Sequence, residues 1–408
     1  SGEIDSSPSI VDQSRASPSS SLGGKNSKEK VGRSPFTKFA MRISTVSGYR
    51  CRVMNEVNPA KERITEVRDQ IRGELSDYLS QQRQYLTSIA SELVPVCDAM
   101  DEFLLDGGKR LRPLFAYAGV LAAGATASRE VIRAISSLEL LQACALIHDD
   151  LMDRSDTRRG KPAIHRHFEN LHQSAAMNGL ASQFGESAAV LLGDLALVWS
   201  DQMLNTSGIS TESLLAAHLI HDEMRIELMA GQYLDVREAG EKTYSAQRSL
   251  RIARYKSGKY TIERPLHIGA VIGLPNPADH KSLLLALSRY GLPLGEAFQL
   301  RDDLLGIYGD PEVTGKPAGD DLREGKRTVL IALALESLGP QEQEQLLSQL
   351  GHSDLSGETI EELRELIRKS GAVDKVEKLI ESLTEESLNA IEDPSIHPSS
   401  REFLTYIA

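Results

Sequence analysis

The chain has 408 residues, 40% of them hydrophobic and 25% charged, and this composition excludes a collagen-like, a wholly disordered and a disulfide-rich protein. Its formal net charge of −12 argues against a protein that chiefly coats nucleic acid or an anionic membrane, because both need a broad basic surface. The cysteines Cys51, Cys97 and Cys144 show no CxxC spacing, so they indicate neither a zinc site nor a disulfide framework, and a reducing cytoplasm fits.

Residues 1–53 are rich in Ser, Gly and Lys, with SPSSSLGG and KNSKEK in succession. Such a segment buries too little apolar surface to order itself, so we predict a disordered N-terminal tail without chemistry of its own. A transit peptide is a weaker interpretation because Glu3, Asp5 and Asp12 lie near the start. Two further interpretations of residues 1–53 are an expression remnant and an extension upstream of Met54.

From about Pro59 onward the apolar residues recur with helical period, and the alternating patterns that mark strands are absent. Glycine- and proline-rich breakers separate helices of unusual length, including 211–237 and 280–308. We therefore predict one all-α domain over residues 54–408. No run reaches the about 18 uncharged apolar residues that a membrane-spanning helix needs, so no stable membrane insertion is expected.

Three of the breakers combine basic residues with glycine. GGKRLRP supplies Lys109, Arg110 and Arg112, RRGKP supplies Arg158, Arg159 and Lys161, and YKSGKY supplies Lys256 and Lys259. Ordinary salt bridges would not need the adjoining glycines, whereas Gly107 and Gly108 let the backbone approach a phosphate closely. These segments therefore indicate anion binding.

The segment from about Arg129 to Asp153 is apolar on nearly all faces, which predicts a central buried helix. It ends in HDDLMD, so Asp149 and Asp153, four residues apart, share one face. Like charges at a helix C-terminus destabilise it unless a cation offsets them.

A second acidic cluster, QLRDDLLGIYGD, ends another long apolar helix and begins with Asp302 and Asp303. One such pair alone is more often a solvated helix end. Two pairs after two apolar helices, with the basic segments beside them, suggest facing walls of one pocket. Carboxylate oxygens suit Mg²⁺, with substrate phosphates filling the remaining coordination positions.

The motifs GGKRLRP, DDLMDRSDTRRGKP, the element around Lys256, FQLRDD and GKPAGDDLREGK occur in this order. With them, residues 59–408 resemble the trans-isoprenyl diphosphate synthases, the family of farnesyl and geranylgeranyl diphosphate synthases. The resemblance implies a bundle of long antiparallel helices around a deep apolar cavity, and a cytoplasmic homodimer that binds no nucleic acid. It also implies Mg²⁺-dependent head-to-tail condensation of allylic diphosphates with isopentenyl diphosphate.

The resemblance also assigns roles to single residues, with three Mg²⁺ ions in each site. Asp149 and Asp153 would bind two ions, supported by Asp150, and Asp302, followed by Asp303, would bind the third. The allylic diphosphate would be held by Arg158, Lys256 and Lys316, and isopentenyl diphosphate by Lys109, Arg112, Gln142 and Arg159. Gln299 would lie beside the growing cation, Ser257 near the bond that ionises, and Asp321 and Lys326 in a loop that closes over the diphosphates.

The second acidic motif departs from the family pattern DDxxD, because Gly306 stands where the third aspartate is expected. Asp302 remains, so the loss affects the outer part of the metal site more than the inner part. Asp310 lies about two turns further on, where a loop would have to bring it back. We therefore expect weaker metal binding at the third ion site than at the first two.

Product length depends on the helix that carries the first acidic cluster. Cys144 and Ala145, one to two turns before Asp149, are small, whereas the resemblance implies that bulky aromatic residues there stop chain growth early. A lower cavity floor at Leu141, Leu140 or Trp199 predicts geranylgeranyl diphosphate, with a longer polyprenyl or a farnesyl product as the alternative. A class I terpene cyclase and a non-catalytic partner subunit are less favoured, because all the phosphate-binding cations are retained.

Overall fold

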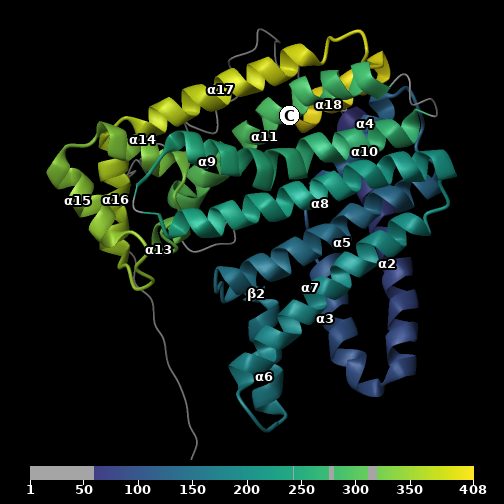
Figure 1. The fold of residues 1–408 in the computed structure, drawn as a ribbon, viewed down its shortest axis with the longest axis horizontal. Helices are drawn as coiled ribbons and strands as arrows, with labels where there is room; N and C mark the ends of the chain where they lie inside the picture. Colours follow the sequence, from purple (N-terminus) through teal and green to yellow (C-terminus); the bar gives the residue numbers. More distant parts are fainter. Residues whose placement is uncertain (1–58, 242, 275–279, 311–318) are drawn as a thin grey trace, which may run out of the picture. The chain divides into compact units, whose positions relative to one another are not determined.

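The computed structural model describes residues 59–241, 243–274, 280–310 and 319–408 (Figure 1). The predicted tail, the boundary at residue 54 and Lys316 lie outside the described residues. The α-helices are α2 (Pro59–Ile89), α3 (Val94–Leu105), α4 (Leu111–Ala122), α5 (Arg129–Met152), α6 (Ile164–Ser174), α7 (Ala181–Asn205), α8 (Thr211–Ala239), α9 (Ala246–Ala253), α10 (Arg264–Gly273), α11 (His280–Tyr308), α13 (Asp320–Arg323), α14 (Val329–Ser337), α15 (Pro340–Gln349), α16 (Gly357–Lys369), α17 (Ala372–Ala390) and α18 (Arg401–Ile407). Two 3₁₀ turns, η1 (Ser91–Leu93) and η4 (Pro398–Ser400), and a π-helix, η2 (Arg254–Glu263), complete the helical elements.

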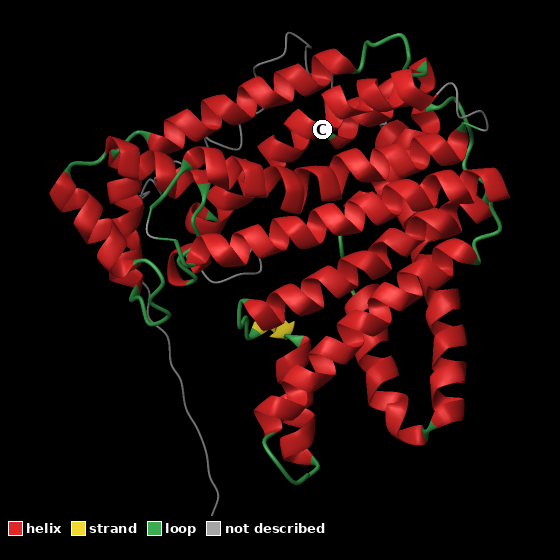
Figure 2. Ribbon diagram, in the orientation of Figure 1, coloured by secondary structure: helices red, strands yellow, loops and turns green. Residues whose placement is uncertain are grey.

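The described chain is helical almost throughout (Figure 2), which confirms the predicted all-α class. One antiparallel hairpin interrupts it, formed by β1 (Thr157–Arg158) and β2 (Lys161–Pro162). Arg159 and Gly160 form its two-residue turn and both have positive φ, 52° and 74°, as tight hairpins require. Strands of two residues are too short to show an alternating pattern, so sequence periodicity did not predict them.

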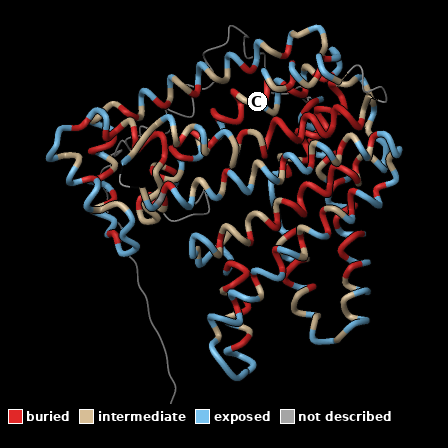
Figure 3. Tube along the Cα trace, viewed as in Figure 1, coloured by how far each residue is buried: buried red, intermediate tan, exposed pale blue. Residues whose placement is uncertain are grey.

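Helix α5 forms the centre of the larger hydrophobic cluster and packs against α7, α2 and α4 (Figure 3). Its start is capped by Ser128, whose Oγ accepts a hydrogen bond from the backbone N–H of Val131. Among the described helices, α5 alone has the length and mean hydropathy, 1.4, of a membrane span. Because 67% of that apolar window is buried inside the structure, α5 is a core helix.

Close backbone contacts hold the π-helix η2 between two long helices, α8 and α11. A Cβ added to Gly231 on α8 would lie 2.7 Å from the backbone nitrogen of Lys256, and one added to Gly295 on α11 would lie 2.3 Å from Gly258 Cα. Only glycine permits such approach. Lys256 and Ser257 are thereby fixed between α8 and the part of α11 that leads to the second acidic cluster.

A second, smaller hydrophobic cluster surrounds the end of α11 and is built with α14, α16 and α17. Leu300, Leu304 and Ile307 of α11 belong to it, whereas Leu283, Leu287 and Tyr290 of the same helix belong to the larger cluster. Helix α11 therefore spans both clusters, and its acidic end lies where α13 packs against it.

Candidate active site

The first acidic cluster lies at the C-terminal end of α5. Asp149 Oδ1 accepts hydrogen bonds from Gln232 Nε2 of α8 at 2.8 Å and from Lys256 Nζ of η2 at 3.1 Å. Lys256 Nζ also contacts Asp235 Oδ2 at 2.7 Å. The three elements α5, α8 and η2 therefore meet at the carboxylate of Asp149.

Asp150 points away from this junction into the protein, where it is buried. Arg158 holds both of its oxygens, with Nε donating to Oδ2 and Nη2 donating to Oδ1, each at 2.5 Å. A two-point pair of this kind fixes the hairpin β1–β2 against α5. Asp150 thus orients Arg158, which agrees with a supporting role.

The pKa values of the other two carboxylates of this cluster, Asp149 and Asp153, shift in opposite directions. Burial raises the pKa of Asp149, but the ammonium of Lys256 more than offsets this, so its pKa is lowered overall. Burial and the neighbouring Asp149 raise the pKa of Asp153 to about 6. Like charges left partly uncompensated at a helix end mark a place where a cation would bind.

The second cluster begins with a chain of hydrogen bonds between η2 and α11. Ser257 Oγ donates to Gln299 Oε1, and Gln299 Nε2 donates to Asp303 Oδ1 at 2.8 Å. Asp303 is buried, and this burial together with Asp321 and Asp302 raises its pKa to about 8. Asp302, one residue earlier, is exposed, so it is the member of the pair accessible to an ion.

Gly306, at the position of the missing aspartate, faces the carboxylate of Asp321. A Cβ at position 306 would lie 2.1 Å from Asp321 Oδ2, a distance at which no side chain fits. The short helix α13 therefore places a carboxylate in the space that a third aspartate of the motif would occupy. The sequence suggested Asp310 for this role, and the structure places Asp321 there.

Lys326 connects the two clusters electrostatically. Its Nζ lies 2.8 Å from Glu324 Oε2 and 3.3 Å from Asp321 Oδ1. Its charge counteracts the raised pKa of Asp153 and of Asp303 and helps to lower that of Asp149. The charge of Lys326 therefore acts on carboxylates of both acidic clusters, while its ion pairs are with Asp321 and Glu324.

The residues predicted to hold isopentenyl diphosphate lie around the start of α4. Arg112 donates from Nη2 to Thr261 Oγ1 at 2.8 Å and its guanidinium stacks 4.2 Å from the Tyr260 ring centre. Arg112 Nε and Gln142 Oε1 are buried and have no hydrogen-bond partner among the described residues. Buried polar atoms of this kind usually have a partner, so a polar ligand would fit here.

Arg159 and Lys109 belong to the same neighbourhood. A Cβ added to Gly108 would lie 3.6 Å from Arg159 Nη2 and 3.4 Å from Arg110 Nη1. Burial and the charge of Arg110 lower the pKa of Arg159, so these cations lack full compensation and favour an anion. Lys109 is exposed. Arg110 instead pairs with buried Glu139 at 2.7 Å, which indicates a structural role.

The residues predicted to set product length lie along α5. Leu141 and Cys144 are buried and Ala145 is half-buried. Cys144 Sγ lies 3.8 Å from His148 Nδ1, and His148 Nε2 lies 3.2 Å from the carbonyl oxygen of Val190 on α7. Trp199 is buried in an edge-to-face contact with Tyr78.

Sequence reasoning missed Gln232 and Asp235, which hold Asp149 and Lys256. Their spacing in GQYLD puts both on one face of α8, and a polar pair on a long, partly apolar helix was the available signal. No motif singled it out, because the partners lie 83 and 21 residues away.

Comparison with known proteins identifies the family of the chain. The profile of the family described as polyprenyl synthetase matches residues 95–367, more than half of the chain. The chain belongs to this family. It is therefore a head-to-tail isoprenyl diphosphate synthase, as the motifs predicted.

Individual relatives cover most of the chain. Geranylgeranyl pyrophosphate synthase from Corynebacterium glutamicum, whose crystal structure is complexed with isoprenyl diphosphate and magnesium, is 41% identical; the match covers 86% of this chain and 98% of that one, with a TM-score of 0.77. Geranylfarnesyl diphosphate synthase of Aeropyrum pernix is 31% identical over 74% of this chain and 88% of its own length. Geranylgeranyl diphosphate synthase of Saccharolobus solfataricus is 29% identical over 74% of this chain and 85% of its own length.

Proposed function

We propose that the chain is a Mg²⁺-dependent geranylgeranyl diphosphate synthase. The observation that carries the proposal is that each acidic cluster holds a lysine: Lys256 contacts Asp149 at the first, and Lys326 contacts Asp321 beside Gly306 at the second. The corynebacterial relative whose structure holds isoprenyl diphosphate and magnesium supports the same ligands here. We further propose that the enzyme acts in the cytoplasm.

The donor set fits magnesium. Asp149, Asp153 and Asp302 offer only carboxylate oxygens, the hard ligands that this ion prefers, and the raised pKa of Asp153 reflects negative charge that a cation would relieve. We assign these three residues to three ions, two at the first cluster and one at the second. When bound, Mg²⁺ supplies Lewis-acid stabilisation of the leaving diphosphate.

The side chains perform the remaining steps. Arg158, Lys256 and Lys316 hold the allylic diphosphate, and Arg112, Arg159, Lys109 and Gln142 hold isopentenyl diphosphate, so that the reacting carbons lie about 3 to 3.5 Å apart. The allylic C–O bond breaks with its electron pair going to the diphosphate. The double bond of isopentenyl diphosphate then attacks the cation, and the departed diphosphate takes the proton that is lost. Apolar walls exclude water, which would otherwise quench the cation.

The product assignment rests on the small side chains of Cys144 and Ala145. We propose that the growing chain passes them and ends near Leu141 or Trp199. Cys144→Phe should shift the product toward farnesyl diphosphate, because the added ring takes up volume within the cavity. Cys144→Ser is the matched control: serine keeps the side chain at this position small, so this variant should retain the long product. An unchanged product pattern in Cys144→Phe would refute this depth assignment.

We also propose a homodimer, formed through α7 and α8. The outward faces of these helices carry large apolar side chains that are 60% to 74% exposed, namely Leu191, Val198, Leu215, Leu219, Ile226 and Tyr233. Several large apolar side chains left exposed on neighbouring helices in the sequence are typical of a protein interface. Leu219→Glu should lower the molar mass measured by light scattering from that of a dimer to that of a monomer. A wild-type mass equal to one chain would refute the proposal.

A condensation assay on the purified chain tests the function. Isopentenyl diphosphate and an allylic diphosphate should yield a prenyl diphosphate in the presence of Mg²⁺ and none with EDTA. A terpene cyclase would convert the allylic substrate without consuming isopentenyl diphosphate. A non-catalytic subunit would be inactive alone, and either result would refute the proposal.

A further inference from the structure

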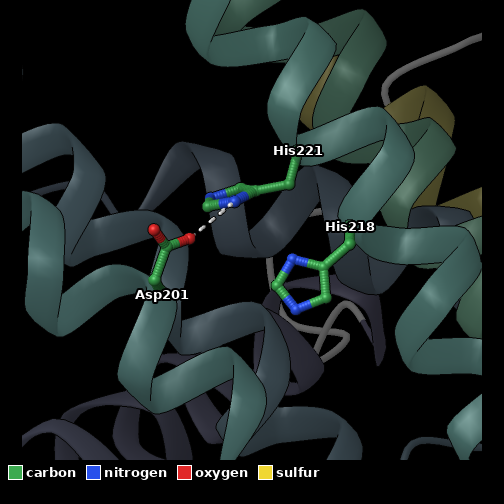
Figure 4. A group of neighbouring side chains, drawn as sticks. All are labelled: Asp201, His218 and His221. Carbon is green, nitrogen blue, oxygen red and sulfur yellow. Dashed lines mark ion pairs between the residues drawn. The ribbon is translucent and has the colours of Figure 1, made fainter.

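Three potential metal ligands converge where α7 ends and α8 begins (Figure 4). Asp201 projects from α7, and His218 and His221 project from α8 toward it, with their candidate ligand atoms within 4.8 Å of one another. The two histidines are three residues apart in sequence and so lie on one side of the helix. No motif of the synthase reaction includes these residues.

Two of the converging atoms are buried and lack hydrogen-bond partners, although they lie within ion-pair distance of each other (dashed line in Figure 4). The side chain of His221 is 0% exposed, and neither its Nδ1 nor Asp201 Oδ1 has a hydrogen-bond partner among the described residues. The two atoms are 3.7 Å apart, too far for a hydrogen bond. Leaving both unsatisfied costs stability, whereas an ion between them would satisfy both.

The other polar atoms of the three side chains are held by neighbours. His218 Nε2 lies 2.8 Å from Asn205 Oδ1, and His221 Nε2 lies 3.5 Å from Ser200 Oγ. When Nε2 of His218 donates to the amide oxygen, its Nδ1 keeps a free lone pair, an arrangement typical of metal-binding histidines.

Arg225 completes the surroundings of the cluster. Its Nη1 donates to Asp201 Oδ2 at 2.6 Å, which orients the carboxylate so that Oδ1 faces the histidines. The guanidinium charge lowers the affinity of this place for any cation. The site must therefore depend on nitrogen coordination more than on net negative charge, which favours transition metals over Mg²⁺.

We propose that Asp201, His218 and His221 bind one Zn²⁺-like divalent ion, which joins α7 to α8, with the fourth position taken by water. Two imidazole nitrogens and one carboxylate oxygen form a common ligand set for this ion. His221 lies 11 residues before Gln232, the α8 residue that contacts Asp149, or about 16 Å along the helix. The ion is therefore separate from the diphosphate site.

Equilibrium dialysis of the full chain tests this proposal. After EDTA treatment, the protein is dialysed against Zn²⁺ with a large excess of Mg²⁺, which occupies the oxygen-only acidic clusters. Wild type should bind one Zn²⁺ per chain under these conditions. His218→Ala and Asp201→Asn should each weaken binding by at least about tenfold, whereas His352→Ala, which removes an exposed histidine elsewhere, should leave it unchanged.

Thermal unfolding gives a second readout. Zn²⁺ should raise the Tm of wild type and not that of Asp201→Asn, a variant that keeps the shape of the side chain. The proposal is overturned if wild type binds no Zn²⁺, or if Asp201→Asn and His218→Ala bind it as wild type does. It is equally overturned if the bound Zn²⁺ is lost in Asp149→Ala, because the ion then belongs to the acidic cluster.

Discussion

Replacing Gly306 by alanine tests whether the carboxylate of Asp321 is used at the second acidic cluster. The added Cβ would stand 2.1 Å from Asp321 Oδ2 and 2.3 Å from its Cγ, whereas nonbonded carbon and oxygen atoms normally keep about 3.5 Å. The carboxylate must then retreat by more than roughly 1 Å. A catalytic group misplaced by about 1 Å can cost 100-fold in rate, so we expect turnover to fall by about tenfold to 100-fold.

The assay is condensation rate against Mg²⁺ concentration, with Tm recorded for each variant. Gly73→Ala is the matched control, because Gly73 also lies in a helix but has no atom within 4 Å of an added Cβ. It should keep full turnover and gain up to about 1 kcal/mol in helix propensity. Moving the carboxylate with Gly306→Asp and Asp321→Gly together should recover part of the Mg²⁺ response lost in Asp321→Gly. Wild-type turnover and Mg²⁺ response in Gly306→Ala would refute the reasoning.

Three further predictions address the site and the fold. Asp149→Ala or Asp302→Ala should lower turnover by several orders of magnitude with little change in Tm, because stabilisation of developing charge is usually the largest catalytic contribution; near-normal rates in both would disprove the metal assignment. Arg112→Ala should raise the KM for isopentenyl diphosphate more than that for the allylic substrate, and equal increases would contradict the proposed partition. Burial lowers the pKa of His267 to about 3, below its unfolded value of 6.5. Between these two pH values the unfolded chain binds one proton more than the folded chain. The free energy of unfolding should therefore fall as the pH drops from about 6.5 toward 3, by roughly 1.4 kcal/mol per pH unit. Tm should decline less steeply with acid in His267→Gln, and parallel Tm profiles would show that other groups control the acid limb.

The long helices could be predicted because each repeats its apolar residues over many turns. The helix predicted at 280–308 extends from His280 to Tyr308, and that predicted at 211–237 extends from Thr211 to Ala239. Both acidic clusters could be located for the same reason, since charge at the end of an apolar helix stands out against its surroundings. These patterns describe local structure only, so they do not predict how one helix packs against another.

Contacts between distant helices account for what the sequence did not predict. Gln232 reaches Asp149 across 83 residues, and Asp321 fills the space at Gly306 only because α13 packs on α11. The group of Asp201, His218 and His221 likewise depends on how the end of α7 lies against α8. Each of these contacts depends on helix packing geometry, and a single sequence predicts the helices but not where they cross.

The ion pairs between lysines and aspartates in the site should couple the binding of metal ions to the binding of diphosphate. Lys256, proposed to hold the allylic diphosphate, is bound to Asp149, proposed to hold Mg²⁺, and Lys326 is bound to Asp321 in the same way. A metal ion arriving alone would have to displace an ammonium group, and a diphosphate arriving alone would have to take that ammonium from a carboxylate. When both arrive together, each lysine moves to a phosphate and each carboxylate to an ion, so no charge is left unpaired. Binding of Mg²⁺ and of diphosphate should therefore be mutually dependent, each raising the affinity for the other by the same factor.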